Sequence, residues 1–225
     1  MASYLDRTIT LLGEDKIRRI QEMRVMVIGL GGVGGTALAA LYRSGFRHFV
    51  LVDNDVVDPS NLNRQIMYDS VDIGKAKTQV CKSKLLRFCG EIDVETIDLY
   101  VDEENVKEII KDIDFVVDAI DYVPGKIGII QECLKKNISF ISSLGMAKRL
   151  DPEKVILTTM NKTENDPLAK KIRYECRQRG LDLKAIPVVF SKENIINNGP
   201  ELGSMMMVPS TAGLLISKFI IQNIK

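Results

Sequence analysis

Glycines, carboxylates and cations that could bind a ligand are concentrated in three stretches of this chain. The first is a glycine run over 29–35, Gly-Leu-Gly-Gly-Val-Gly-Gly, between an apolar stretch at 25–28 and a helix-forming stretch at 36–42. Glycines let a backbone approach phosphate closely, and the free N–H groups at a helix start attract an anion. The apolar run 49–52 then ends at Asp53, whose carboxylate can accept hydrogen bonds from a ribose diol. A turn without a ligand would explain the glycines alone, but strand, turn, helix and terminal acid together predict a nucleotide site.

The second stretch is the polar loop that follows Asp53. It carries Asp55, Asn61, Arg64 and Gln65. A loop in this position reaches the carboxyl-terminal edge of the sheet, where such folds bind ligands. The Arg64 guanidinium offers planar, bidentate donors that suit a phosphate or a carboxylate.

A helix predicted over 75–88 places two lysines in its first turn, Lys75 and Lys77. A cation there is electrostatically unfavourable unless an anion lies nearby. We expect at least one of the two to reach a phosphate, whereas either one taken alone could face solvent.

The third stretch is the apolar run 115–117, which ends at Asp118 and is followed by Asp121. Acids at the end of a strand can simply cap the next helix, which is predicted over 123–136. An acid that faces a bound triphosphate is instead a natural magnesium ligand, because magnesium prefers carboxylate and phosphate oxygens and water. We favour the magnesium role for Asp121 and leave both roles open for Asp118.

In order and spacing, these residues resemble the ubiquitin-activating-enzyme-like adenylyltransferase superfamily, which includes the ThiF, MoeB and HesA proteins. The resemblance covers most of residues 7–145. It implies that MgATP binds here and that a substrate carboxylate attacks the α-phosphate, which yields an acyl-adenylate and pyrophosphate. The matching positions, which are the expected nucleotide-binding residues, are Gly29, Gly31, Gly32, Gly34, Asp53, Asp55, Asn61, Arg64, Gln65, Lys77, Asp118 and Asp121.

The resemblance also implies individual roles. Asp53 would hold the ribose, and Asn61, Arg64 and Lys77 would hold the phosphates. Asp121 would bind Mg²⁺, and a monovalent cation is allowed in the loops after it.

An arginine at the place of Arg7 reaches the neighbouring subunit's ATP phosphates in this superfamily. The resemblance therefore implies a homodimer with two composite sites, in which the expected catalytic residues are Arg7, Arg64, Lys77 and Asp121.

Weaker motifs extend the likeness along nearly the whole chain. Within the superfamily they resemble the tRNA threonylcarbamoyladenosine dehydratase subfamily, and they lie at 7–14, 141–152, 162–170, 189–193 and 203–209. The implied substrate is a tRNA whose modified adenosine carries a threonylcarbamoyl carboxylate. That carboxylate would be activated with ATP and then cyclised.

Two other functions stay open at this point. One is adenylation of the C-terminal carboxylate of a sulfur-carrier or ubiquitin-like protein, and a sulfur-acceptor or other protein partner is compatible with it. The other is a nicotinamide-dependent oxidoreductase, which would leave Asn61, Arg64 and Lys77 without a role.

The cysteines argue against zinc and against thiol transfer. Cys81, Cys89, Cys133 and Cys176 form no Cys-x-x-Cys pair, so we expect a zinc-free protein in which they are small buried hydrophobes within helices. Relatives that pass an acyl group to cysteine carry one in the loop that corresponds to 161–166, which has none here.

Composition narrows the possible partners, metal sites and location of the protein. A net charge of +1 provides no global basic field for nucleic acid, although a basic cluster lies between Lys170 and Arg179. The single histidine, His48, precludes a histidine-rich metal site. No secretory signal opens the chain, and the apolar stretch 212–224 is too short to span a bilayer, so we expect a cytoplasmic protein without a membrane segment.

The elements that must position these residues alternate along the chain. Strands are predicted at 24–28, 48–53, 93–99, 115–118 and 139–142, and helices at 14–22, 33–44, 75–88, 103–110 and 123–136. This alternation is typical of an α/β fold with a doubly wound, mostly parallel, Rossmann-like sheet.

The rhythm changes after residue 151. A strand at 155–160, a helix at 167–179 and a strand at 185–190 are predicted, then a loop marked by Gly199, Pro200 and Gly203, a short strand and a core-facing helix over 212–224. The resemblance implies that these strands extend the sheet antiparallel. We therefore expect one domain over 1–225, with an ATP-binding core at 1–150 and a sheet extension with the last helix at 151–225.

Overall fold

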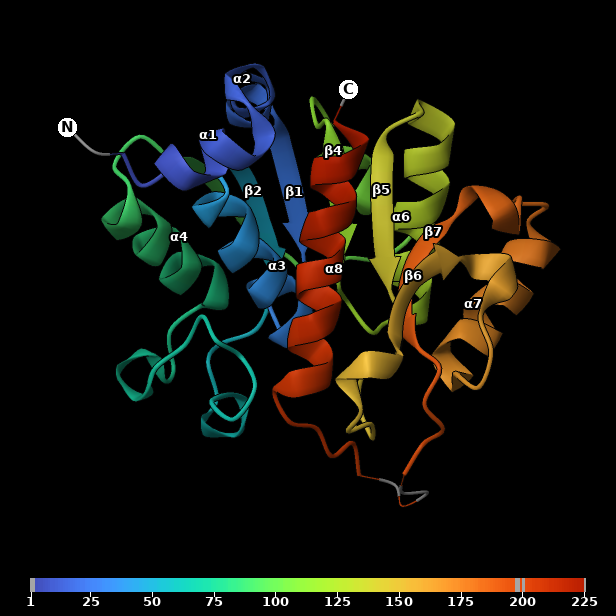
Figure 1. Ribbon diagram of the computed structural model, residues 1–225. Coiled ribbons are helices and arrows are strands. Elements are labelled where there is room, and N and C mark those ends of the chain that lie inside the picture. Colours follow the sequence, from blue (N-terminus) through green and yellow to red (C-terminus); the bar gives the residue numbers. More distant parts are fainter. Residues whose placement is uncertain (1–2, 197–198, 200, 225) are drawn as a thin grey trace.

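A seven-stranded sheet forms the centre of the computed structural model, which describes residues 3–196, 199 and 201–224 (Figure 1). The strand order is β3-β2-β1-β4-β5-β7-β6. The strands are β1 (Arg24–Ile28), β2 (His48–Asp53), β3 (Asp93–Asp98), β4 (Phe115–Asp118), β5 (Ser139–Ser143), β6 (Val155–Thr159) and β7 (Pro187–Ser191). All neighbouring pairs are parallel except β6 and β7, so the predicted doubly wound, mostly parallel sheet is confirmed.

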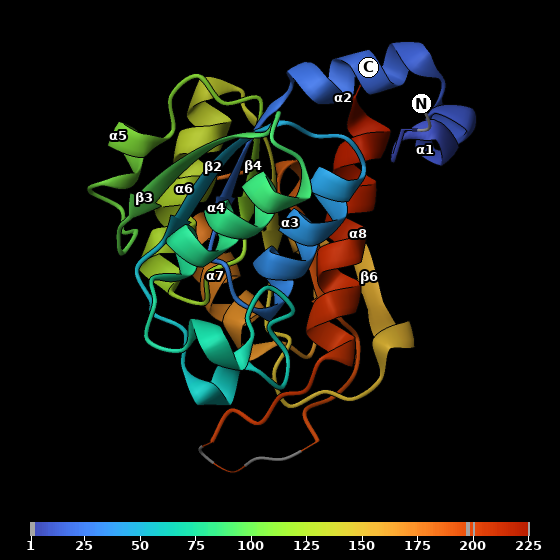
Figure 2. The ribbon, with the colours of Figure 1, turned by 90° about the vertical axis from the view of Figure 1, so that its left-hand side faces the viewer.

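Helices cover both faces of the sheet because its central strands are apolar on both sides. In β1, Val25 and Val27 pack into one hydrophobic core, whereas Met26 and Ile28 pack into the other. Helices α3, α4 and α8 lie on the first face and α6 and α7 on the second (Figures 1 and 2). The helices are α1 (Asp6–Leu12), α2 (Glu14–Glu22), α3 (Gly32–Arg43), α4 (Lys77–Phe88), α5 (Val106–Ile109), α6 (Val123–Lys136), α7 (Pro167–Gln178) and α8 (Met207–Asn223). No helix within these described residues is long and apolar enough to cross a membrane.

The last helix holds the glycine turn in place. Helix α8 packs against α3 so closely that a Cβ at Gly213 would lie 2.6 Å from the Val33 backbone oxygen. The Ser217 hydroxyl donates a hydrogen bond to the Ala37 carbonyl at 3.1 Å. The predicted core-facing helix is thus confirmed, although it begins at Met207 rather than at residue 212.

The C-terminal third extends the sheet with an antiparallel pair of strands, as predicted, and one strand of that pair keeps the direction of the rest of the sheet. Strand β7 runs parallel to β5, and only β6 is antiparallel to its neighbour. The loop 144–154 delivers the chain to the carboxyl-terminal edge, so β6 must run back across the sheet and β7 can then run forward again beside β5. The short strand expected before α8 is absent from residues 201–206, and Pro200, expected in the preceding loop, lies outside the described residues.

Candidate nucleotide-binding site

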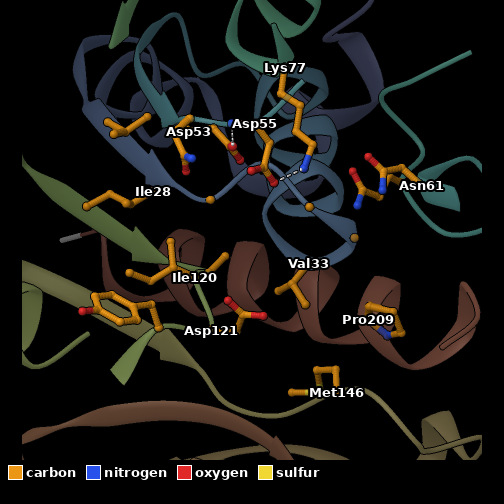
Figure 3. Close-up of a pocket in the computed structure, with 18 of the residues that line it drawn as sticks. Ile28, Val33, Asp53, Asp55, Asn61, Lys77, Ile120, Asp121, Met146 and Pro209 are labelled. Atoms are coloured by element: carbon orange, nitrogen blue, oxygen red, sulfur yellow. Dashed lines mark hydrogen bonds and ion pairs between the residues drawn. The ribbon is translucent and has the colours of Figure 1, made fainter. Parts of the chain in front are cut away.

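A cavity of about 400 Å³ lies at the carboxyl-terminal edge of β1, β2 and β4 (Figure 3). This is the place where an open α/β sheet binds ligands. Ten of the predicted site residues line it: Gly29, Gly31, Gly32, Asp53, Asp55, Asn61, Arg64, Gln65, Lys77 and Asp121. Three others, Gly34, Asp118 and Arg7, are not in its lining.

The glycine turn is shaped by close backbone contacts. Gly29 has a φ of 90°, which favours glycine, and a Cβ there would lie 2.8 Å from the Ala119 carbonyl. A Cβ on Gly34 would lie 1.8 Å from the Gly29 oxygen, so Gly34 shapes the turn from behind without facing the cavity. A Cβ on Gly31 would meet only the Gln65 side chain, at 3.9 Å. The backbone is therefore exposed to a ligand at Gly31.

The start of α3 is open to an anion. Its N-cap is Gly31, and no side chain caps it. Gly31, Gly32 and Val33 all line the cavity. The first N–H groups of a helix have no partner within it, and they carry the positive end of its dipole. A phosphate placed here would be bound by backbone alone.

Asp53 ties the glycine turn to the next loop. Its carboxylate accepts a hydrogen bond from the Leu30 N–H at 2.6 Å and another from the Asp55 N–H at 2.8 Å. Each carboxylate oxygen has a second lone pair, so both can still accept from a ribose diol. Asp53 thus orients the turn and can also hold the sugar.

The two candidate lysines differ in their surroundings. The Lys77 side chain is 5% exposed, and its Nζ lies 2.7 Å from Asp55 Oδ2 on the cavity wall. The Lys75 side chain is 59% exposed and lies 3.6 Å from Asp72 Oδ1. The structure therefore selects Lys77 as the lysine that faces the cavity, and α4 begins there rather than at Lys75.

The loop 54–76 presents three further donors and acceptors. The Asn61 Oδ1 accepts from the Asp58 N–H at 3.1 Å, which leaves its amide N–H groups for a ligand. Arg64 donates from Nη1 to the Ser60 carbonyl at 2.7 Å and to the Asn63 Oδ1 at 2.9 Å, which leaves the N–H groups of Nε and Nη2 for the cavity. The Oε1 of Gln65 is buried and has no partner among the described residues. A buried acceptor of this kind can be satisfied by a hydroxyl or amino group of a ligand, whereas the uncapped helix start beside it suits an anion.

Asp121 is the acid that reaches the cavity. Its side chain is exposed, and no hydrogen bond or ion pair to it occurs in the described part of the chain. Figure 3 shows its carboxylate across the cavity from the Lys77–Asp55 pair. It is therefore available for a cation that bridges to a phosphate.

Asp118 does not reach the cavity, contrary to its expected place among the nucleotide-binding residues. It is fully buried, and its Oδ2 lies 2.9 Å from the Lys126 Nζ and 2.6 Å from the Ser142 hydroxyl. Lys126 lies in the first turn of α6, and its ammonium group forms a buried ion pair with the Asp118 carboxylate. Neither reading made for Asp118, a helix cap or a ligand contact, describes this arrangement.

Arg7 lies far from the cavity of its own chain. It is an exposed residue of α1, which packs near the amino-terminal edge of the sheet, whereas the cavity lies at the opposite edge (Figure 1). Arg7 can therefore contact a nucleotide only in a second subunit.

One wall of the cavity was not predicted. It consists mainly of aromatic and apolar residues from four loops and from the first turn of α8, namely Leu99, Tyr100, Val101, Tyr122, Met146, Ala147, Leu202, Ser204 and Pro209. The rings of Tyr100 and Tyr122 lie 5.0 Å apart. Such residues also fill ordinary cores, so their types carried no signal.

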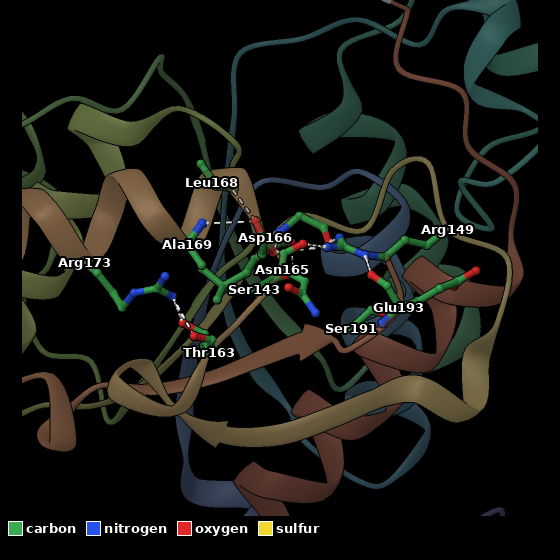
Figure 4. Close-up of polar contacts among 12 residues, drawn as sticks. Ser143, Arg149, Thr163, Asn165, Asp166, Leu168, Ala169, Arg173, Ser191 and Glu193 are labelled. Atoms are coloured by element: carbon green, nitrogen blue, oxygen red, sulfur yellow. Dashed lines mark hydrogen bonds and ion pairs between the residues drawn. The ribbon is translucent and has the colours of Figure 1, made fainter. Parts of the chain in front are cut away.

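A buried arginine holds the loop that bears Met146. The Arg149 guanidinium donates to the backbone oxygens of Glu193 at 3.1 Å and of Asn165 at 3.2 Å (Figure 4). Asp166 accepts from the Gly145 N–H at 3.0 Å. Three chain segments are thereby joined, which fixes the wall opposite the glycine turn.

The cysteines lie outside the cavity lining. All four are free thiols; Cys81, Cys133 and Cys176 are buried in helices, whereas Cys89 follows the end of α4 and is half-buried. Burial raises the pKa of the Cys81 thiol to about 12. The described residues contain no group of three or more His, Cys, Asp or Glu side chains arranged to hold a metal ion.

Comparison with known proteins agrees with this geometry. A model of the ThiF family matches residues 5–164. The tRNA threonylcarbamoyladenosine dehydratase of Bacillus subtilis is 31% identical over 243 residues, which cover 100% of this chain and 95% of that protein. The Escherichia coli protein of the same name is 34% identical over 196 residues, which cover 84% of this chain and 73% of that one.

Solved structures show the same likeness. The crystal structure of the E. coli dehydratase in complex with ATP superposes with a TM-score of 0.94 at 29% identity, and the match covers 98% of this chain and 93% of that chain. Its complex with AMP gives a TM-score of 0.93. The resemblance drawn from the sequence is confirmed: this chain belongs to the ThiF family.

Proposed function

We propose that this protein is an ATP-dependent tRNA threonylcarbamoyladenosine dehydratase, which adenylates the threonylcarbamoyl carboxylate of a tRNA adenosine and lets it cyclise. One observation carries the proposal. The cavity combines an uncapped helix start, the Lys77 cation and the unpaired Asp121 carboxylate, in a chain that is similar to these dehydratases along its whole length.

The residues of the cavity divide the nucleotide between them. Asp53 accepts hydrogen bonds from the ribose, and the N–H groups at Gly31 and Gly32 bind phosphate oxygens. Arg64 and Lys77 add fixed positive charge where negative charge develops on the phosphates. These groups are held before the ligand arrives, so little reorganisation accompanies the reaction.

A magnesium ion fits the acid that faces this space. Magnesium is usually bound by one or two carboxylates together with phosphates and water, so Asp121 suffices as the protein ligand. When bound, the ion would neutralise charge on the phosphates. Asp121 would hold the ion, and Asp55 keeps Lys77 in place.

The second half of the reaction needs no protein nucleophile. A free carboxylate is a poor acylating agent, and adenylation gives it a good leaving group that a neighbouring substrate atom can displace. The cysteines are absent from the cavity lining, which supports direct cyclisation over thiol transfer.

A homodimer would complete each site. Arg7 lies at the far end of its own subunit, and in a twofold dimer it could be lent to the partner's phosphates. Mixing Arg7→Ala chains with Asp121→Asn chains tests this arrangement, since one site in each hybrid is then whole. A hybrid no more active than its parents, or a monomer at micromolar concentration, contradicts it.

We also propose that the reaction takes place in the cytoplasm, where the tRNA is found.

The experiment that tests the function is release of AMP and pyrophosphate from ATP. The purified protein is given tRNA that carries the threonylcarbamoyl modification, the same tRNA without it, or a sulfur-carrier protein with a free C-terminus. Release with the modified tRNA alone supports the proposal. Release with the carrier protein alone would move the protein to the carrier-activating branch of the superfamily.

A further inference from the structure

Three polar side chains lie completely buried next to the cavity without touching it. Asp118, Lys126 and Ser142 are each 0% exposed. The Lys126 Nζ lies 2.9 Å from Asp118 Oδ2 and 3.1 Å from the Ser142 Oγ, and the Ser142 hydroxyl donates to Asp118 Oδ2 at 2.6 Å. The cluster contains one positive and one negative group, and none of its members has a part in the proposed chemistry.

The ion pair bridges the loop that carries the proposed metal ligand. Asp118 is the last residue of β4, and Lys126 lies in the first turn of α6. The segment between them, 119–122, supplies Ala119, Ile120 and Asp121 to the cavity lining. The Lys126 side chain therefore joins the two ends of this loop.

Asp121 depends on its backbone for its direction. No hydrogen bond or ion pair to its carboxylate occurs among the described residues, so no such bond orients it. The Ala119 N–H donates to the Ile28 carbonyl at 2.8 Å, which holds the start of the loop. A Cβ on Gly125 would lie 2.4 Å from the Val101 oxygen, so the first turn of α6, at the other end of the loop, packs closely against the backbone of Val101.

Stability does not explain charges at this place. Burying an ion pair carries a large desolvation penalty, and a well-packed apolar pair of similar volume is often as stable or more stable. What the pair adds is a directional link of fixed length, because Lys126 must meet both Asp118 and Ser142. Buried ion pairs can in this way specify one arrangement of the chain.

We propose that Asp118, Lys126 and Ser142 are positioning residues that hold the segment 119–122 so that Asp121 faces the metal and phosphates. This inference rests on the proposed role of Asp121. Groups hydrogen-bonded to a metal ligand typically change metal affinity by about 10- to 100-fold when they are removed; these three residues act on Asp121 only through the backbone, so we expect a loss of about 10-fold here.

The test measures metal binding rather than turnover. Mn²⁺ is titrated into the protein saturated with ATP, and bound Mn²⁺ is followed by electron paramagnetic resonance. The variants are Lys126→Met, the uncharged pair Asp118→Asn/Lys126→Met, and Ser142→Ala. Lys136→Met is the matched control, because Lys136 lies on the same helix and pairs with Glu132 at 2.8 Å, away from the loop. Thermal unfolding checks that each variant folds.

The expected result is weaker Mn²⁺ binding in Lys126→Met and in the uncharged pair, a smaller loss in Ser142→Ala, and wild-type binding in Lys136→Met. Wild-type Mn²⁺ affinity in a folded uncharged pair would overturn the inference. If that pair does not fold, wild-type affinity in Ser142→Ala overturns it instead.

Asp121→Asn is measured alongside to separate the two proposals. Loss of Mn²⁺ binding in Asp121→Asn without loss in the cluster variants refutes the positioning role alone. Wild-type binding in Asp121→Asn refutes the metal role of Asp121, and the inference fails with it.

Discussion

Replacing Lys77 should weaken ATP binding while leaving the fold intact. A lysine ammonium about 4 Å from a phosphate charge gains about 4 kcal/mol at an effective dielectric constant of about 20. The ion pair with Asp55, at 2.7 Å, already satisfies part of that charge and lowers the gain. A charge-assisted contact is worth about 2 kcal/mol net, so Lys77→Met should raise the Kd for ATP about 30-fold. Asp55 is 58% exposed and stays hydrated without its partner, so little folding stability should be lost.

Calorimetric titration with ATP and with AMP checks this magnitude. AMP lacks the outer phosphates, so its affinity should fall much less than that of ATP. Lys75→Met is the matched control, because Lys75 is two residues away but solvent-exposed, and its ATP affinity should equal that of the wild type. Wild-type affinity in Lys77→Met, or an equal loss in Lys75→Met, would refute the assignment of Lys77 to the phosphates.

Three further predictions have defined outcomes. Asp121→Asn keeps the size of an exposed side chain but removes its charge, so turnover should fall about 100-fold or more with an unchanged melting temperature; near-normal turnover would show that the acid is not needed. Gly34→Ala places a Cβ 1.8 Å from a backbone oxygen. It should cost about 3 kcal/mol or more and lower the Tm by about 6–12 °C, whereas Gly90→Ala, with open space around it, should melt like the wild type. Burial raises the pKa of Cys81 to about 12, so this thiol stays neutral and unreactive at about pH 8. A thiol reagent should then label only Cys89 in the native protein, and rapid labelling of a second cysteine would contradict the burial.

The central strands could be predicted because they are short apolar runs: β2 and β4 end at Asp53 and Asp118, and β1 leads into the glycine turn. The bounds of β1, β2 and β4 match the prediction residue for residue. The direction of β7 could not be predicted in this way, since it depends on where the loop 144–154 delivers the chain. Periodicity describes one element at a time and does not contain that information.

Within the site, residue type indicated which side chains could bind a ligand, but the surrounding residues decide which of them face the cavity. Asp118 and Asp121 are both aspartates and lie three positions apart, yet Asp118 is buried and Asp121 faces the cavity. The difference is made by Lys126 and by Ser142, which comes from a strand 24 residues further along. Long-range partners of this kind leave no local pattern in the sequence.

The central claim is that ATP is consumed to remove water from a modified tRNA adenosine. The most direct measurement incubates the protein with ATP, magnesium and tRNA that carries threonylcarbamoyladenosine, digests the tRNA, and weighs its nucleosides by mass spectrometry. The account predicts that the modified adenosine loses the mass of one water and that one AMP appears for each nucleoside converted. The account would be contradicted if folded protein left both the modified nucleoside and the ATP unchanged. It would also be contradicted if the nucleoside were converted without ATP.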